Sequence, residues 1–142
     1  MIRFELGTLF FDRQAVISKV DAATRRVLSR FGAFVRQRAK SSIRKRRKPA
    51  PPGFPPSSHT GLLKKFIFFG YDTGRKSVVI GPAKLGGKGR GQAPSLLEYG
   101  GGMTLNRRGK SRRVNYQARP YMGPAFEKEQ PRLPALWRGS IK

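Results

Sequence analysis

The chain has 142 residues, no cysteine and a formal net charge of +24, from 31 Lys and Arg against 7 Asp and Glu. The length fits one domain, and the lack of thiols excludes disulfides and thiolate metal sites. No stretch approaches the ~20 apolar residues of a membrane span, and residues 1–6 lack the basic and apolar runs of a signal peptide. We therefore expect a soluble protein made in a cytoplasm.

The first long element predicted is a helix over residues 13–45, with Asp12 as its N-cap. Apolar side chains recur at steps of three and four and form one stripe: Val16, Val20, Ala23, Val27, Phe31 and Phe34. A helix of this length would measure about 50 Å at ~1.5 Å per residue. We therefore expect its basic second half, from Arg36 onward, to project beyond the core. Before it, alternation in residues 2–6 predicts a short strand.

A proline-rich segment follows, with five prolines in residues 49–56. Proline excludes a helix here and favours extended polyproline geometry. We interpret residues 49–61 as a semi-rigid arm, with a plain linker as the alternative. Gly53, Phe54 and His59 are unusual in a spacer, and a phenylalanine among prolines tends to dock on another surface.

Residues 62–117 are predicted to form two β-hairpins with basic loops. The first turns at Asp72-Thr73-Gly74 and returns through residues 77–80. Phe66 and Phe68 should face one side and Ile67 and Phe69 the other. Both faces are apolar, so we expect the long helix to cover one and a neighbouring subunit the other. The second hairpin pairs residues 103–105 with 113–117 across a basic tip.

Residues 118–142 are predicted to hold a short helix, starting near Pro124, and a tail. The chain is thus expected to be a single α+β domain over residues 1–142. In it, a long N-terminal helix packs on a small antiparallel β-sheet, with an extended proline-rich arm and basic loops.

The sequence shows no pattern typical of catalysis or metal binding. His59 is the only histidine, and the acidic residues are few and scattered. Glu98, isolated among cations, is expected to pair with a nearby arginine. Gly87-Lys88 resembles part of a phosphate loop, but Pro82 replaces its first glycine and Gly89 its hydroxyl residue. We predict no enzyme activity, no metal and no cofactor.

Charge is concentrated in two segments. Residues 36–48 hold eight basic side chains and no acid, and residues 84–119 hold nine against Glu98. Such segments favour a polyanion, which could be nucleic acid, an acidic protein surface or an anionic membrane. The alternative is that they are solvated loops that keep the protein soluble.

Several short motifs follow one another in a fixed order. They are Pro52-Gly53-Phe54-Pro55-Pro56, Thr60-Gly61-Leu62-Leu63, Ile80-Gly81-Pro82, Leu97-Glu98-Tyr99-Gly100-Gly101 and Ala118-Arg119-Pro120-Tyr121-Met122-Gly123-Pro124-Ala125-Phe126-Glu127. From about residue 33 to the C-terminus, this order resembles the head–tail joining or tail-completion proteins of tailed bacteriophages, also called neck or minor tail proteins. The chain departs from the family at Gly100-Gly101-Gly102, where glycine–threonine is usual, and in expanded loops at 84–93 and 106–113.

The resemblance implies a structural virion protein rather than an enzyme. It implies a closed ring, a hexamer, around the channel that DNA crosses between head and tail. The implied partners are copies of the chain itself, the adjoining connector or adaptor and tail-tube proteins, and packaged double-stranded DNA, with no membrane. The implied location is the neck or tail of the virion, after synthesis in the bacterial cytoplasm.

The candidate contact residues fall into two groups. For contacts between subunits or rings they are Pro51, Pro52, Phe54, Pro55, Pro56, His59, Phe66 and Phe68. For contacts with DNA in the channel or with acidic partners they are Arg44, Lys45, Arg46, Arg47, Lys48, Lys84, Lys88, Arg90, Arg107, Arg108, Lys110, Arg112 and Arg113. Two other functions stay open: a basic nucleic-acid-binding protein of ribosomal or nucleoid type, and a morphogenetic factor absent from the finished particle.

Overall fold

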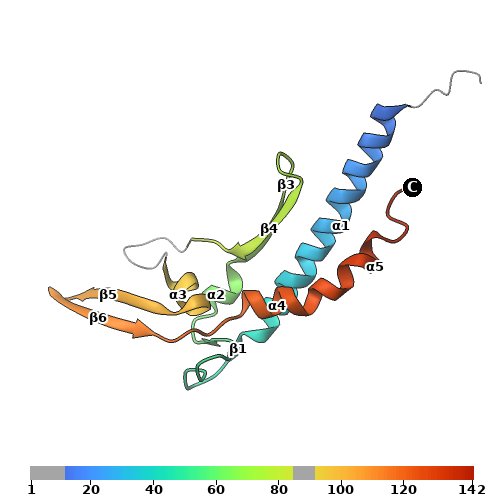
Figure 1. Cartoon of the computed structure of the whole chain (residues 1–142). Helices are drawn as coiled ribbons and strands as arrows, with labels where there is room; N and C mark the ends of the chain where they lie inside the picture. The colour runs from blue at the N-terminus through green and yellow to red at the C-terminus, as the bar shows by residue number, and fades with distance from the viewer. Residues whose placement is uncertain (1–11, 85–91) are drawn as a thin grey trace, which may run out of the picture.

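The computed structural model describes residues 12–84 and 92–142 (Figure 1). The strand predicted at residues 2–6 and the basic residues Lys88 and Arg90 lie outside the described residues. The α+β prediction is confirmed, because a long N-terminal helix is combined with small antiparallel sheets. The strands form three separate two-stranded sheets rather than one sheet.

Helix α1 (Arg13–Ser42) is the central element of the fold. Asp12 caps it as predicted, since its Oδ1 accepts a hydrogen bond of 2.9 Å from the Ala15 amide. The helix lies between the β3–β4 hairpin on one side and helices α4 and α5 on the other (Figure 1). It ends at Ile43, whose extended backbone leads into the two-residue strand β1 (Arg44–Lys45).

The expectation that the basic second half of α1 projects beyond the core is wrong. That half supplies the buried side chains Ala39 and Ile43, whereas Val16 and Val20 in the first turns are exposed. Arg36 and Arg38 reach neighbouring elements, whereas the basic residues Arg44 to Lys48 after the helix are exposed. The Arg36 Nε, for example, donates a 2.7 Å hydrogen bond to a backbone carbonyl of β3.

Strands β3 (Ile67–Asp72) and β4 (Ser77–Pro82) form the predicted first hairpin. The Asp72 carboxylate shapes its turn by accepting hydrogen bonds from the amides of Gly74 and Arg75. The hairpin approaches α1 very closely at Gly32. A Cβ at that position would lie 2.8 Å from Val78 Cγ2 and 2.9 Å from Phe69 Cδ2, so only glycine permits this packing.

The segment between α1 and β3 forms a loop whose two ends lie side by side. Strand β1 pairs in parallel with β2 (Ser57–Ser58), and the short helix α2 (Leu62–Lys65) follows. Ala50 and Pro56 are buried within the chain. The proline-rich segment is therefore joined to the body at both of its ends.

The second hairpin is longer than predicted. Helix α3 (Ala93–Tyr99) precedes it, and strands β5 (Gly101–Arg107) and β6 (Lys110–Tyr116) pair over seven residues each. Arg108 and Gly109 at the tip have φ of +51° and +75°. Two positive φ values are the mark of a tight two-residue turn, which lets pairing continue to the tip. Figure 1 shows this hairpin extending away from α1.

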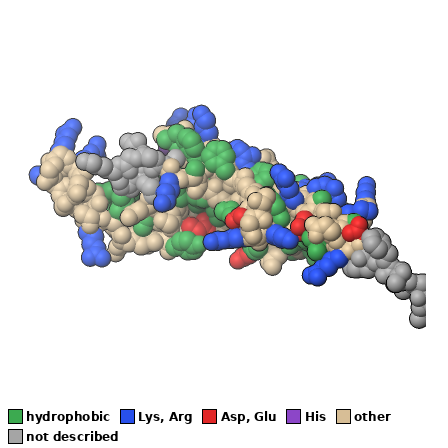
Figure 2. Space-filling view, turned by 90° about the horizontal axis from the view of Figure 1, so that it is seen from above, with side chains coloured by type: hydrophobic (Ala, Val, Ile, Leu, Met, Phe, Trp, Pro, Cys, Tyr) green, Lys and Arg blue, Asp and Glu red, His purple; other side chains and the backbone are tan. Residues whose placement is uncertain are grey.

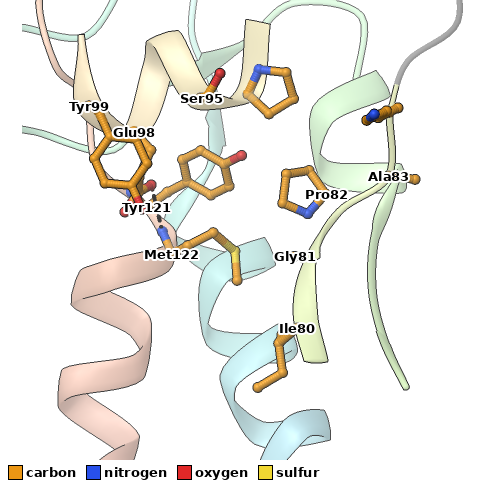
Figure 3. A pocket seen from close by; sticks show the side chains of 11 residues that line it. Ile80, Gly81, Pro82, Ala83, Ser95, Glu98, Tyr99, Tyr121 and Met122 are labelled. Atoms are coloured by element: carbon orange, nitrogen blue, oxygen red, sulfur yellow. Dashed lines mark hydrogen bonds between the residues drawn. The ribbon is translucent and has the colours of Figure 1, made fainter. Parts of the chain in front are cut away.

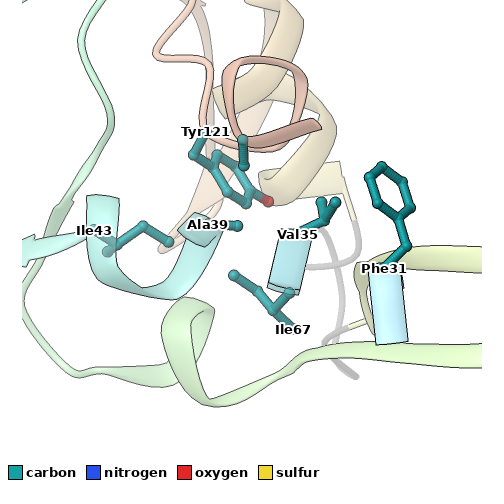
Figure 4. Close-up of a cluster of buried hydrophobic side chains, with 7 residues drawn as sticks. Phe31, Val35, Ala39, Ile43, Ile67 and Tyr121 are labelled. Atoms are coloured by element: carbon teal, nitrogen blue, oxygen red, sulfur yellow. The ribbon is translucent and has the colours of Figure 1, made fainter. Parts of the chain in front are cut away.

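The core lies where α1, β3 and α4 meet. Helix α4 (Met122–Glu129) is followed by the 3₁₀ turn η2 (Gln130–Arg132) and helix α5 (Leu133–Trp137). The buried cluster consists of Phe31, Val35, Ala39, Ile43, Ile67, Tyr121 and Ala125 (Figure 4). Burying a large apolar side chain contributes about 1.5–3 kcal/mol, so this cluster fixes α1 between the hairpin and the C-terminal helices.

Candidate functional site

Glu98, at the end of α3, caps the start of α4. Its Oε2 accepts hydrogen bonds from the amides of Tyr121 (2.9 Å) and Met122 (3.0 Å), and its Oε1 accepts from Gly123 (2.7 Å). These amides have no partner within the helix, and a carboxylate is favoured at this positive end of the helix dipole. The prediction that Glu98 pairs with an arginine is therefore wrong, since its partners are backbone groups.

The proline-rich segment meets the same junction. The Gly53 amide donates to the Ala118 carbonyl at 2.9 Å, and Arg119 Nε donates to the Ala50 carbonyl at 2.7 Å. The Arg119 amide in turn donates to the Leu97 carbonyl. Motifs far apart in the sequence thus come together, and their local role is to join the arm, α3 and α4.

A cavity of about 330 Å³ lies beside this junction, between the end of β4, α3 and the start of α4 (Figure 3). Ile80, Pro82 and Met122 give it an apolar lining. Burial raises the pKa of the Tyr121 phenol above its ordinary value, and the neighbouring Glu98 carboxylate adds to this effect. The phenol is therefore neutral at physiological pH, and the Glu98 oxygens are already engaged by amides.

The outer face of the β3–β4 hairpin is apolar and exposed. By the pairing register, Phe68 and Gly70 of β3 share this face with Val79 and Gly81 of β4. Phe68 is 49% exposed and Val79 is 64% exposed. The ring of Phe66 meets that of Phe68 edge to face at 6.3 Å. The predicted division of the hairpin is confirmed on its inner face, where Ile67 is buried and Phe69 lies against α1.

The candidate contact residues of the arm differ in how much surface they offer. Pro51, Pro52 and His59 are exposed, and Phe54 is 59% exposed. Pro55 is half-buried, as is Phe66 in the first hairpin. Pro56 is buried within the chain and has little surface to offer a neighbour.

The described basic candidates are all exposed and form two groups. The first comprises Arg44 to Lys48 on and after β1, and the second comprises Arg107, Arg108, Lys110, Arg112 and Arg113 on the β5–β6 hairpin. A hollow lined by Pro49, Asn115 and Arg119, among others, brings the end of the first group close to the base of the hairpin. Lys84 lies apart, just after β4.

Two residues with a clear structural role were not predicted from the sequence. Val79 completes the exposed apolar face, and Glu129 is buried beside Arg38 and Arg132. The signal for Val79 was present, since it alternates with the inward-facing Val78 and Ile80 on the returning strand. For Glu129 there was none, because its arginine partner Arg38 lies 91 positions earlier in the chain.

Residues 12–84 and 92–142 contain no group of three or more histidines and acids placed to hold a metal ion. Within the same ranges, no helix has the length and apolar character needed to cross a membrane. Comparison of the chain with known protein families, curated proteins and solved structures gives no match.

Proposed function

We propose that this chain is a non-catalytic structural protein that assembles with copies of itself into a ring, at the head–tail interface of a tailed bacteriophage. The observation that carries the proposal is the exposed apolar face of the β3–β4 hairpin. Its inner face packs on α1, while Phe68 and Val79 on the outer face remain open to solvent. Exposed apolar patches of this kind mark sites of protein association.

The arm supports the same proposal. Its base is held by hydrogen bonds at Ala50 and Gly53, yet the next side chain, that of Phe54, is largely exposed. An aromatic side chain on a segment that is already ordered loses little conformational entropy on docking. The arm is therefore suited to contact a neighbouring subunit or an adjoining ring.

The ordered motifs of the sequence support the proposed location at the head–tail interface. They resemble those of neck and tail-completion proteins, and three of them, at residues 52–56, 97–101 and 118–127, are joined by hydrogen bonds around Glu98 and Arg119. A ring in this position would present its apolar surfaces to copies of itself. Its basic surfaces would face the DNA channel or the acidic surfaces of connector and tail-tube proteins.

The proposal is tested with Phe68→Ser in the phage that encodes the chain, with Leu62→Ser as the matched control. Leu62 is also an exposed large apolar residue, but it belongs to α2 and not to the β3–β4 hairpin. We expect electron microscopy of Phe68→Ser lysates to show separate heads and tails, and the control to give joined particles. Normal Phe68→Ser particles, or mature particles in which mass spectrometry finds no copy of this chain, would contradict the proposal.

The arm is tested by a substitution rather than a deletion. Removing residues 51–56 would also remove the buried Pro56 and the Gly53 hydrogen bond, so a failure to fold would be confused with a failure to dock. Phe54→Ser leaves both in place. We expect folded protein that joins heads to tails poorly, and full infectivity of this variant would exclude a docking role for Phe54.

A further inference from the structure

The β5–β6 hairpin carries a strong charge of one sign. Residues 101–116 hold five basic side chains and no acidic one. All five are exposed, and Figure 2 shows blue Lys and Arg side chains around the end of the molecule that this hairpin forms. A ribbon of this charge that extends from the body is suited to a polyanion.

The two faces of this hairpin differ in chemistry. The register places Met103, Leu105 and Val114 on one face together with Arg107, Lys110 and Arg112, and Arg112 lies directly opposite Leu105. The opposite face carries Thr104, Asn106, Ser111, Arg113 and Asn115. We call this second set the polar face. Every one of its side chains can form hydrogen bonds, and none is negatively charged.

Contacts on the polar face confirm that its side chains lie together. The Ser111 hydroxyl donates a hydrogen bond to Asn106 Oδ1 across the two strands, so this bond uses the acceptor of Asn106 and not its NH2 donors. At Gly102, a Cβ would lie 3.0 Å from Asn115 Oδ1 and 3.5 Å from Arg113 Nε. The glycine thus leaves space into which the Arg113 and Asn115 side chains converge.

We propose that the β5–β6 hairpin binds double-stranded DNA by laying its polar face in the major groove. Seven residues at ~3.3 Å each give strands of about 20 Å, and the ~12 Å major groove admits a two-stranded β-ribbon. Arg113, Asn106 and Asn115 are residue types that hydrogen-bond to base edges. Arg107, Arg108, Lys110 and Arg112, at the tip or on the opposite face, have long side chains with which to reach the flanking phosphates.

The polar face favours a nucleic acid over the other polyanions. A membrane would take the other face, where apolar side chains and three cations lie together, and would leave the polar face without a role. An acidic protein surface offers acceptors only, because carboxylates do not donate hydrogen bonds, and it would leave the acceptor oxygens of the polar face without partners. The amides and hydroxyls of Asn106, Thr104 and Asn115 match base edges, which carry donors as well as acceptors.

This inference rests on the proposed function only for the source of the DNA, which is the duplex in the neck channel. The test uses the purified full chain and a fluorescent DNA duplex, with binding followed by anisotropy over a range of salt concentrations. A net charge of +24 makes some binding to any DNA inevitable, so the comparison is between two variants that each lose one charge. Arg113→Gln acts on the polar face and Arg112→Gln on the opposite face.

We expect Arg113→Gln to weaken duplex binding about five- to tenfold more than Arg112→Gln. Arg113→Lys should restore only part of the loss, since lysine keeps the charge but not the planar fork. Equal losses of duplex affinity in the two glutamine variants would show that positive charge alone accounts for binding, and would overturn the assignment of the polar face. A larger loss in Arg112→Gln would do the same.

Two competitors decide the class of partner. Polyglutamate at equal total charge should displace the duplex poorly, and phosphatidylserine vesicles should lose no more binding with Arg113→Gln than with Arg112→Gln. Polyglutamate that competes as well as unlabelled duplex, or vesicles that lose more binding with Arg113→Gln than with Arg112→Gln, would overturn the proposal in favour of an acidic protein or a membrane. Neither binding assay depends on head–tail joining. A negative result in these assays therefore leaves the proposed function untouched, and normal particles from the Phe68→Ser phage would leave the DNA-binding inference untouched.

Discussion

The Oε1 atom of Glu98 lies 2.7 Å from the backbone nitrogen of Gly123, and this contact fixes the end of α3 against the start of α4. A Cβ at position 123 would lie 3.1 Å from the same oxygen, so the glycine makes room for the carboxylate. The other carboxylate oxygen, Oε2, accepts hydrogen bonds from the amides of Tyr121 and Met122. One side chain thus satisfies three amides that the helix leaves without partners.

We therefore expect Glu98→Ala to lower the free energy of unfolding by about 1–3 kcal/mol, since the part-buried amides lose their acceptor. Glu98→Gln should lose less, because one of its two terminal atoms still accepts. The measurement is urea unfolding of the full chain. Glu127→Gln is the control, since it removes an exposed acid from the same helix. Equal stabilities of all these variants would show that the cap contributes nothing.

The elements that were predicted correctly are those with local signals. The stripe of apolar residues predicted α1, and Asp72-Thr73-Gly74 predicted the turn between β3 and β4. The error over which half of α1 projects has a physical cause. The stripe runs through Val16 and Phe31 alike, and only the tertiary structure shows that the second is covered by the core and the first is not.

Predicting the site from the sequence failed where the partners are backbone groups. Glu98 stands among cations in the sequence, but its partners are amides 23 to 25 positions further on. Backbone amides occur at nearly every residue and give no sequence signal, so only basic side chains could be predicted as partners of an isolated acid such as Glu98. The ring contacts and the DNA contacts remain predictions, because both depend on molecules outside this chain.

The close approach at Gly32 predicts a strong preference for glycine. A valine there would force Phe69 and Val78 away from α1, and overpacking of this kind lowers stability by about 1–3 kcal/mol. Gly70→Val is the matched control. A Cβ at Gly70 meets nothing within 4 Å, and valine favours strands. We expect thermal unfolding to show a lower midpoint for Gly32→Val than for Gly70→Val, and equal midpoints would contradict the packing described here.

Glu129 makes a buried ion pair with Arg38, and Arg132 Nη1 lies 3.2 Å from its second oxygen. Glu129 is only 2% exposed, so its charge needs these partners. Arg38→Met should lower the free energy of unfolding by more than the ~1 kcal/mol of an exposed pair. It should lower it by less than the ~3–5 kcal/mol of a fully buried pair, because Arg132 remains.

The double variant Arg38→Met with Glu129→Leu provides the decisive comparison for this pair. It removes both charges together, and replacing a buried pair by apolar side chains is often neutral. We expect urea unfolding to show the double variant to be more stable than Arg38→Met alone. A loss equal to the sum of the two single losses would show that the side chains do not interact.

The buried phenol of Tyr121 predicts a loss of stability at high pH. Burial and the Glu98 carboxylate raise its pKa in the folded state above the ordinary value of 10.0. Above pH ~10 the unfolded chain therefore releases a proton that the folded chain retains. Since stability falls with pH wherever the folded state binds more protons, this contribution is complete below pH ~10 and is lost progressively above it.

Tyr121→Phe keeps the ring in the core but has no proton to release. Its free energy of unfolding should therefore fall less than that of the wild type between pH 9 and pH 11.5, as measured by urea unfolding across this range. Tyr99→Phe is the control, because Tyr99 is 82% exposed and its loss should leave the wild-type slope unchanged. Lysines titrate in the same range, but they are common to all three proteins and do not affect the comparison. Identical slopes for Tyr121→Phe and the wild type would mean that the phenol ionises as readily in the folded chain as in the unfolded one.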